Sequence, residues 1–320
     1  MNITETIKKP CIIEHFESII EPRMLLKTRH KLIDIVAITL CGVLSGADDW
    51  TEIASFGRAK EEWLKGFLEL PSGIPSHDTF GRVFARIRPE EFEQCFINWV
   101  QAAFGEIAPQ VVAIDGKTSR HSYDKASKKA AIHMVSAWAA DNRLVLGQIK
   151  TEEKSNEITA IPELLKVLEL TGSIVTIDAM GCQKAIVSQI VEKGADYVIS
   201  LKGNQGNLHK EVKSFFEDAK ASGLDTISHD TFKTTDGDHG RVEIRSFTTT
   251  DEIAWFEDKS KWEKLTTFGM VETERHIGDK ITYETRYYIS SLPNNAKQLG
   301  NAARGHWGGA LKTGYTGFLM

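Results

Sequence analysis

The sequence is poor in cysteine and has no long apolar run. The longest strongly apolar stretch, Leu32 to Leu44, contains Asp34 and is shorter than the ~20 residues of a membrane span. The amino terminus lacks the basic-then-apolar pattern of an export signal, so we expect a cytoplasmic protein with no membrane partner. The cysteines form no Cys-x-x-Cys pair, which argues against a zinc knuckle or a disulfide framework. They are Cys11, Cys41, Cys95 and Cys182.

The chain also lacks an excess of positive charge. It has 39 Lys and Arg residues against 44 Asp and Glu residues, for a net charge of −5. This excludes a uniformly basic protein that coats nucleic acid, but it allows a local basic face. With 41% hydrophobic residues, the 320-residue chain can form a substantial core, in two domains or one large one.

Residues 1–104 are predicted to form a small helical domain. Apolar residues recur near the 3.6-residue period in residues 32–44, 50–67 and 92–104. Pro71, Gly73 and Pro75 interrupt the pattern. Ser76 is a plausible N-cap, and Pro89 is a favourable first residue for the last of these helices.

Residues 105–320 are predicted to form a mixed sheet flanked by helices, which makes the fold class α/β. Short β-branched runs end at Asp115, Asp178 and Lys202, and stretches with helical character separate the later ones. Asp141 and Asn142 indicate a hairpin turn between two strand-like stretches, residues 132–140 and 144–150. In residues 225–291, apolar and polar residues alternate as they do in β-strands, and this region is predicted to be a β-rich insertion.

The most informative residues are Asp115 and Asp178. Each follows a buried strand, and neighbouring strands would bring both carboxylates to one edge of the sheet. Carboxylates are hard oxygen ligands that suit Mg²⁺, and two such ions ~3.5–4 Å apart can catalyse phosphodiester chemistry. Aspartates at strand ends also commonly cap turns or helices, and spacing alone leaves this alternative open.

Basic residues cluster after the first of these aspartates. Lys117 and Arg120 begin a cationic stretch that would suit a phosphate backbone. Lys202, at a strand end, and Arg241, in a turn followed by alternating charges, could also approach phosphate. Taken alone, the cluster is better explained as a solvated loop or helix face and the Arg241 turn as an exposed hairpin, whereas a strand-to-helix turn explains Lys202 equally well.

Six ordered motifs give the sequence a resemblance to a known family. Together they resemble the H-repeat-associated transposases of bacterial insertion sequences, which belong to the DDE superfamily with an RNase H-like core. The similarity extends from about residue 12 to residue 308. The motifs are Gly73-Ile-Pro-Ser-His-Asp-Thr-Phe80, Ile114-Asp-Gly-Lys117, Thr176-Ile-Asp-Ala-Met180, Leu201-Lys-Gly-Asn-Gln205, His239-Gly-Arg241 and Arg286-Tyr-Tyr-Ile-Ser-Ser291.

The resemblance implies a DNA transposase that cuts element ends and joins them to target DNA with Mg²⁺ or Mn²⁺. It makes Asp115 and Asp178 the first two catalytic, metal-binding acids. It also implies a helical domain for recognition of DNA ends, and it suggests a homodimer on DNA. Phosphate contacts from Lys117, Arg120, Lys202 and Arg241 rest on charge and on membership of the motifs.

The sequence departs from the family where the third acid belongs. After Gly308 the family continues Ile-Glu-Asn, and that glutamate completes the triad, whereas no glutamate follows Glu284 here. Written in synonymous codons and read one nucleotide out of frame, the family segment becomes Leu-Lys-Thr-Gly-Tyr-Thr-Gly-Phe-Leu-Met, identical to residues 311–320. We therefore expect a frameshift within the codons of residues 308–310 and a truncated transposase.

Three functional outcomes are compatible with this pattern. A triad acts through cooperative geometry, so we expect the chain to have lost most or all strand cleavage. The alternative is a non-catalytic DNA-binding remnant that occupies element ends or inhibits intact transposase. A third possibility is a chain that misfolds, which the absence of a cooperative melt would reveal.

Overall fold

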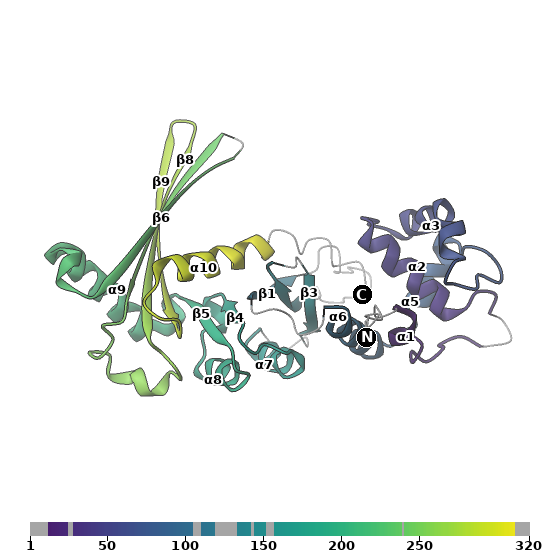
Figure 1. Cartoon of the computed structure of the whole chain (residues 1–320), viewed down its shortest axis with the longest axis horizontal. Helices are drawn as coiled ribbons and strands as arrows, with labels where there is room; N and C mark the ends of the chain where they lie inside the picture. The colour runs from purple at the N-terminus through teal and green to yellow at the C-terminus, as the bar shows by residue number, and fades with distance from the viewer. Residues whose placement is uncertain are drawn as a thin grey trace, which may run out of the picture. The chain divides into compact units, whose positions relative to one another are not determined.

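The structure is a computed structural model that describes residues 12–24, 28–104, 110–118, 133–141, 144–151, 157–238 and 240–310 (Figure 1). The chain divides into two compact units, one formed mainly by the chain up to Ile107 and the other beginning at Ala108. Among the described residues, no helix is long and apolar enough to span a membrane.

The first unit is helical, as the apolar periodicity predicts. Asp34, the charged residue of the apolar run, is buried in α2 and accepts a hydrogen bond from the Leu70 backbone N–H at 3.1 Å. Ser76 precedes α5, and Pro89 is the first residue of α6. The helices are α1 (Ile12–Phe16), α2 (Leu32–Leu44), α3 (Trp50–Ala59), α4 (Glu61–Leu64), α5 (His77–Phe84) and α6 (Pro89–Phe104).

Within the described residues, the second unit is built on one nine-stranded sheet with the strand order β3-β2-β1-β4-β5-β9-β8-β7-β6. Strand β2 is antiparallel to both β1 and β3, whereas β1, β4 and β5 are parallel, as in an RNase H-like core. The predicted α/β fold class is confirmed. The strands are β1 (Val111–Thr118), β2 (His133–Ala139), β3 (Leu144–Lys150), β4 (Ile174–Ile177), β5 (Asp196–Leu201), β6 (His229–Asp238), β7 (Arg241–Thr250), β8 (Thr267–Ile277) and β9 (Lys280–Ser290).

Strands β6 to β9 extend the core sheet. The last third of β9 pairs with β5, with Ser290 opposite Val198 and Tyr287 opposite Leu201. The opposite ends of β8 and β9 reach well beyond the helices (Figure 1). Sequence alternation predicts strands in this region, but it does not identify their partners, so the continuity with the core sheet was not predicted.

Helix α10 covers one face of this sheet, and α7 and α8 lie on the other (Figure 1). Val198, Phe247 and Tyr288 are buried in one cluster with Leu299 and Ala302 of α10, so these three strand residues mark the α10 face. Helix α9 contacts β9. The helices are α7 (Glu157–Val167), α8 (Lys184–Glu192), α9 (Gly206–Ser222) and α10 (Ala296–Ala310).

Glycines allow α10 to approach the sheet closely. A Cβ atom added at Gly305 would lie 3.0 Å from Val111 Cγ1 on β1, and one added at Gly300 would lie 3.0 Å from the Phe247 ring on β7. Both distances are shorter than ordinary van der Waals contact. Larger residues would push α10 away from β1 and β7, which carry the polar groups described below.

Candidate functional site

The pairing of β1 with β4 brings Asp115 and Asp178 together. The two strands are parallel, and Ile114 lies opposite Ile177. Asp115 directly follows Ile114, and Asp178 directly follows Ile177. The two aspartates therefore occupy equivalent positions on neighbouring strands. This is the juxtaposition that the two similar sequence patterns predict, and the register provides the reason for it.

Both aspartates lie on the α10 face. One pair back in the register, Ala113 lies opposite Thr176, and the Thr176 hydroxyl is 3.2 Å from Nδ1 of His306 on α10. Because side chains alternate between the faces of a sheet, Asp115 and Asp178 share the face of Ala113 and Thr176. The carboxylates therefore lie beside the carboxy-terminal part of α10.

Asp178 also caps a turn, which is the alternative role that its position suggests. Its Oδ1 accepts a hydrogen bond from the Met180 backbone N–H at 2.9 Å, at the start of the 3₁₀ turn η2 (Ala179–Gly181). The turn after β5 supports η2, since the side-chain amide of Asn204 donates to Ala179 O and that of Gln205 donates to Cys182 O at 2.7 Å. A cap through one oxygen is compatible with metal binding through the other.

The turn that carries Asp178 requires a glycine at position 181. A Cβ atom there would lie 2.2 Å from Ile177 Cγ2 and 3.0 Å from Ile161 Cδ1. We expect Gly181→Ala to lower the free energy of unfolding by about 1–3 kcal/mol, the usual cost of overpacking. Gly203→Ala is the control, because no atom lies within 4 Å of a Cβ at that position. Urea denaturation would measure both, and equal stabilities would contradict this packing.

His306 is a further residue of the site that the sequence reasoning did not select. It is buried, with 5% of its surface exposed. Burial lowers the pKa of His306, while the negative charges of Asp115 and Asp178 and the bond with Thr176 act in the opposite direction. His306 lies within residues 12–308, the part of the sequence that resembles the transposase family, and this position in the resembling segment is the only feature of the sequence that points to it.

Two carboxylates on one sheet edge fit Mg²⁺, which commonly binds one or two protein carboxylates and keeps several waters. Within the described parts of the chain, no group of three or more His, Cys, Asp or Glu side chains could hold a metal ion. Counting on from Gly308, the glutamate of the family pattern falls at position 310, which is Ala310 here. This position is one helical turn after His306 and therefore on the same side of α10.

The structure describes the side chains of two of the four predicted phosphate contacts, Lys202 and Arg241, and these two residues lie at different parts of the sheet. Lys202 directly follows β5, which is the neighbour of β4, and its side chain is exposed. Arg241 begins β7 and forms an ion pair with Glu243, with Nε 3.5 Å from Oε1. Lys117 lies on β1, but its side chain, like the whole of Arg120, lies outside the described residues.

Comparisons with known proteins agree with this architecture. The family described as "Transposase DDE domain" matches residues 106–308, and the family described as "DDE_Tnp_1-associated" matches residues 13–100. The "H repeat-associated putative transposase YhhI" of Escherichia coli (strain K12) is 42% identical over 303 residues, which are 92% of this chain and 79% of that protein. An "Uncharacterized protein in dhlA 3'region" of Xanthobacter autotrophicus is 46% identical over 279 residues, which are 86% of this chain and 92% of that protein. The chain therefore belongs to the DDE transposase family.

Proposed function

We propose that Asp115 and Asp178 bind Mg²⁺ or Mn²⁺ for the cleavage and joining of DNA at the ends of an insertion sequence. The observation that carries the proposal is the register of β1 and β4, which puts both carboxylates at equivalent positions on the α10 face. Hard oxygen donors on adjacent strands are the ligands that these cations prefer.

The bound metal would activate an attacking hydroxyl and stabilise the leaving oxygen of a phosphodiester. The residues of the chain fix where this occurs. The turn η2 holds the backbone of Asp178, and β2 holds Asp115 through its pairing with Ser136. His306 links α10 to β4 through Thr176, which keeps the helix beside the two carboxylates.

We further propose that a protein of these 320 residues binds DNA but cleaves it very slowly. Two acids can hold one ion, but the position of the third acid is occupied by Ala310, so a second ion would lack a charged ligand. The alternative function, a non-catalytic remnant that occupies element ends or inhibits intact transposase, follows from the same observation. Both functions require a folded chain that binds DNA.

Other family features belong to the same proposal. Residues 1–104 would recognise DNA ends, and a homodimer would form on DNA. Lys117 and Lys202 would contact phosphates close to the aspartates, because Lys117 is on β1 and Lys202 follows β5, the neighbour of β4. Arg120, three residues after Lys117 in the sequence, would add a further phosphate contact. Light scattering of the chain with and without duplex DNA would test the homodimer.

The proposed function is tested by binding and cleavage measured on the same purified chain. We expect a cooperative thermal melt, a gel shift of duplex DNA carrying insertion-sequence ends, and no more than trace nicking with Mg²⁺ or Mn²⁺. Robust metal-dependent nicking would overturn the proposed loss of cleavage. Failure to bind DNA in low salt would overturn both the transposase and the remnant functions.

A further inference from the structure

All arginines in the described parts of strands β6 to β9 lie on the α10 face of the sheet. Along β7, Arg241, Glu243 and Arg245 alternate onto the same face as Phe247, whose ring packs beneath Gly300 of α10. Strands β8 and β9 each contribute one further arginine to this face, and α10 contributes another. Arg275 of β8 lies opposite Glu243, Arg286 of β9 lies opposite Val271, and Arg304 extends from α10 to β6.

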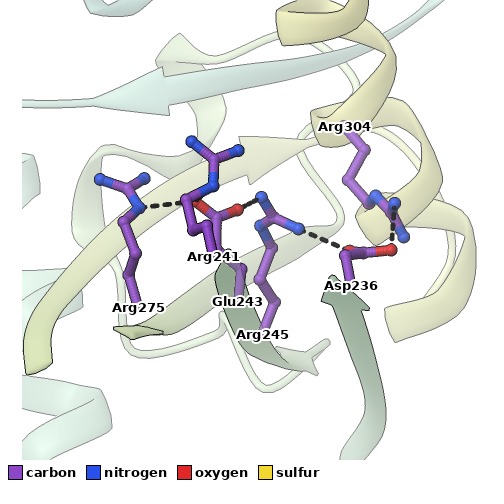
Figure 2. A network of polar contacts seen from close by, with 6 residues as sticks. All are labelled: Asp236, Arg241, Glu243, Arg245, Arg275 and Arg304. Atoms are coloured by element: carbon purple, nitrogen blue, oxygen red, sulfur yellow. Dashed lines mark hydrogen bonds and ion pairs between the residues drawn. The ribbon is translucent and has the colours of Figure 1, made fainter. Parts of the chain in front are cut away.

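Two carboxylates hold four of these guanidinium groups in place (Figure 2). Glu243 has only 4% of its side chain exposed; it accepts hydrogen bonds from Arg245 and, at 2.5 Å, from Nε of Arg275, and it pairs with Arg241. Asp236 accepts from Nη1 of Arg245 at 2.7 Å and from Nη2 of Arg304 at 3.0 Å.

The network has a surplus of positive charge. Each of the four arginines contacts a carboxylate, but the two carboxylates carry only two negative charges, so the six residues of Figure 2 have a net charge of +2. Burial lowers the pKa of Arg245; Asp236 opposes this, and the charges of Arg304, Arg241 and Arg275 lower it further. Like charges held this close favour binding of an anion.

The surplus charge faces a hollow that solvent can reach. The cavity measures about 700 Å³ and is lined by all six residues of the network. Side chains at its rim remain partly exposed, at 51% for Arg241, 39% for Arg275 and 41% for Arg304. An anion could therefore reach the guanidinium groups without unfolding of the sheet.

We propose that this arginine hollow binds consecutive phosphates of the DNA strand that enters the Asp115–Asp178 site. The inference rests on the proposed function, and it adds to the two aspartates a second region of the protein that contacts DNA. The planar guanidinium group matches phosphate with two parallel hydrogen bonds, and each phosphodiester carries one negative charge, so two of them would balance the network.

The hollow lies where a DNA strand that leads to the two aspartates could pass. Both lie on the α10 face of one sheet, and α10 connects them. Arg304 reaches the hollow, and His306, two residues later, is close enough to Asp115, Asp178 and Arg286 for their charges to affect its pKa. A DNA strand bound to this face would therefore run along α10 from the arginine hollow to the carboxylates of Asp115 and Asp178.

The salt dependence of DNA binding tests this assignment. The full chain is titrated against a fluorescein-labelled 30-base-pair duplex at several salt concentrations, together with the double variant Arg241→Gln/Arg304→Gln. We expect the slope of log K against log salt to become about 1–2 units shallower and the affinity to fall about tenfold at 0.1 M salt. Lys166→Gln is the control, because Lys166 is an exposed cation of α7, where it pairs with Glu163. The control slope should match that of the unmodified chain.

A second measurement needs no variant. Phenylglyoxal modifies accessible arginines, and mass spectrometry of the peptides would compare Arg275 and Arg304 with and without the duplex. We expect DNA to protect both. An unchanged slope in a double variant with an unchanged melting temperature, or no protection in a chain that binds the duplex, would overturn the arginine site while the proposed function stands. No binding by the unmodified chain would overturn the proposed function itself.

Discussion

Replacing Ala310 with glutamate should increase the Mn²⁺-dependent nicking of plasmid DNA by about 100-fold over the unmodified chain. Such a gain corresponds to about 2.7 kcal/mol of transition-state stabilisation. Position 310 is one helical turn after His306, whose charged neighbours include Asp115 and Asp178. A carboxylate there would add a third oxygen donor on the same side of α10. Conversion of supercoiled plasmid to open circles, followed on agarose gels, measures the rate.

Two matched variants show whether the gain comes from a metal ligand. Ala310→Gln adds a side chain of the same size without a negative charge, so it should nick no faster than the unmodified chain. Ala310→Glu combined with Asp178→Asn should return to that baseline, because the added acid acts only with its partners. Equal activity of the glutamate and glutamine variants would contradict a third acid at this position.

Asp178→Asn should weaken Mn²⁺ binding by about 100-fold, or about 2.7 kcal/mol. The substitution removes the negative charge, but the asparagine Oδ1 can still accept the hydrogen bond from Met180 that caps the turn η2. The fold should therefore persist while the metal affinity falls. Electron paramagnetic resonance of unbound Mn²⁺ during a titration measures the affinity.

Asp115→Asn should produce a loss of similar size, since both carboxylates are proposed to bind the same ion. Asp225→Asn is the matched control, because this aspartate lies in an exposed 3₁₀ turn far along the chain from both strands. If the control weakens binding as much as Asp178→Asn, the measured Mn²⁺ is bound elsewhere. If neither Asp115→Asn nor Asp178→Asn changes the affinity, the proposed metal site is wrong.

The fold could be predicted as far as local patterns determine it. The β-branched runs that end at Asp115 and Asp178 become β1 and β4, and the apolar periodicity of residues 32–44 becomes α2. The pairing of β9 with β5 could not be predicted, since alternation fixes the faces of a strand but leaves its partner open.

The candidate site shows the same limit. Sequence spacing predicts that two aspartates share an edge, because parallel neighbouring strands end together. It does not predict His306, whose role depends on how closely glycines let α10 approach the sheet. Nor does it predict that Arg275, Arg304 and Asp236 join the charged residues of β7, because that arrangement depends on the register of three long strands and on the packing of a helix.

The central claim is that Asp115 and Asp178 form one metal site on the α10 face of the sheet. Its most direct test is an anomalous difference map from crystals of the chain grown with millimolar Mn²⁺ and measured near the manganese edge. We predict a peak within coordination distance of both carboxylates, at about 2.0–2.3 Å from the nearest oxygens. A map with Mn²⁺ bound only at other residues, or with no peak between the two aspartates, would contradict the claim.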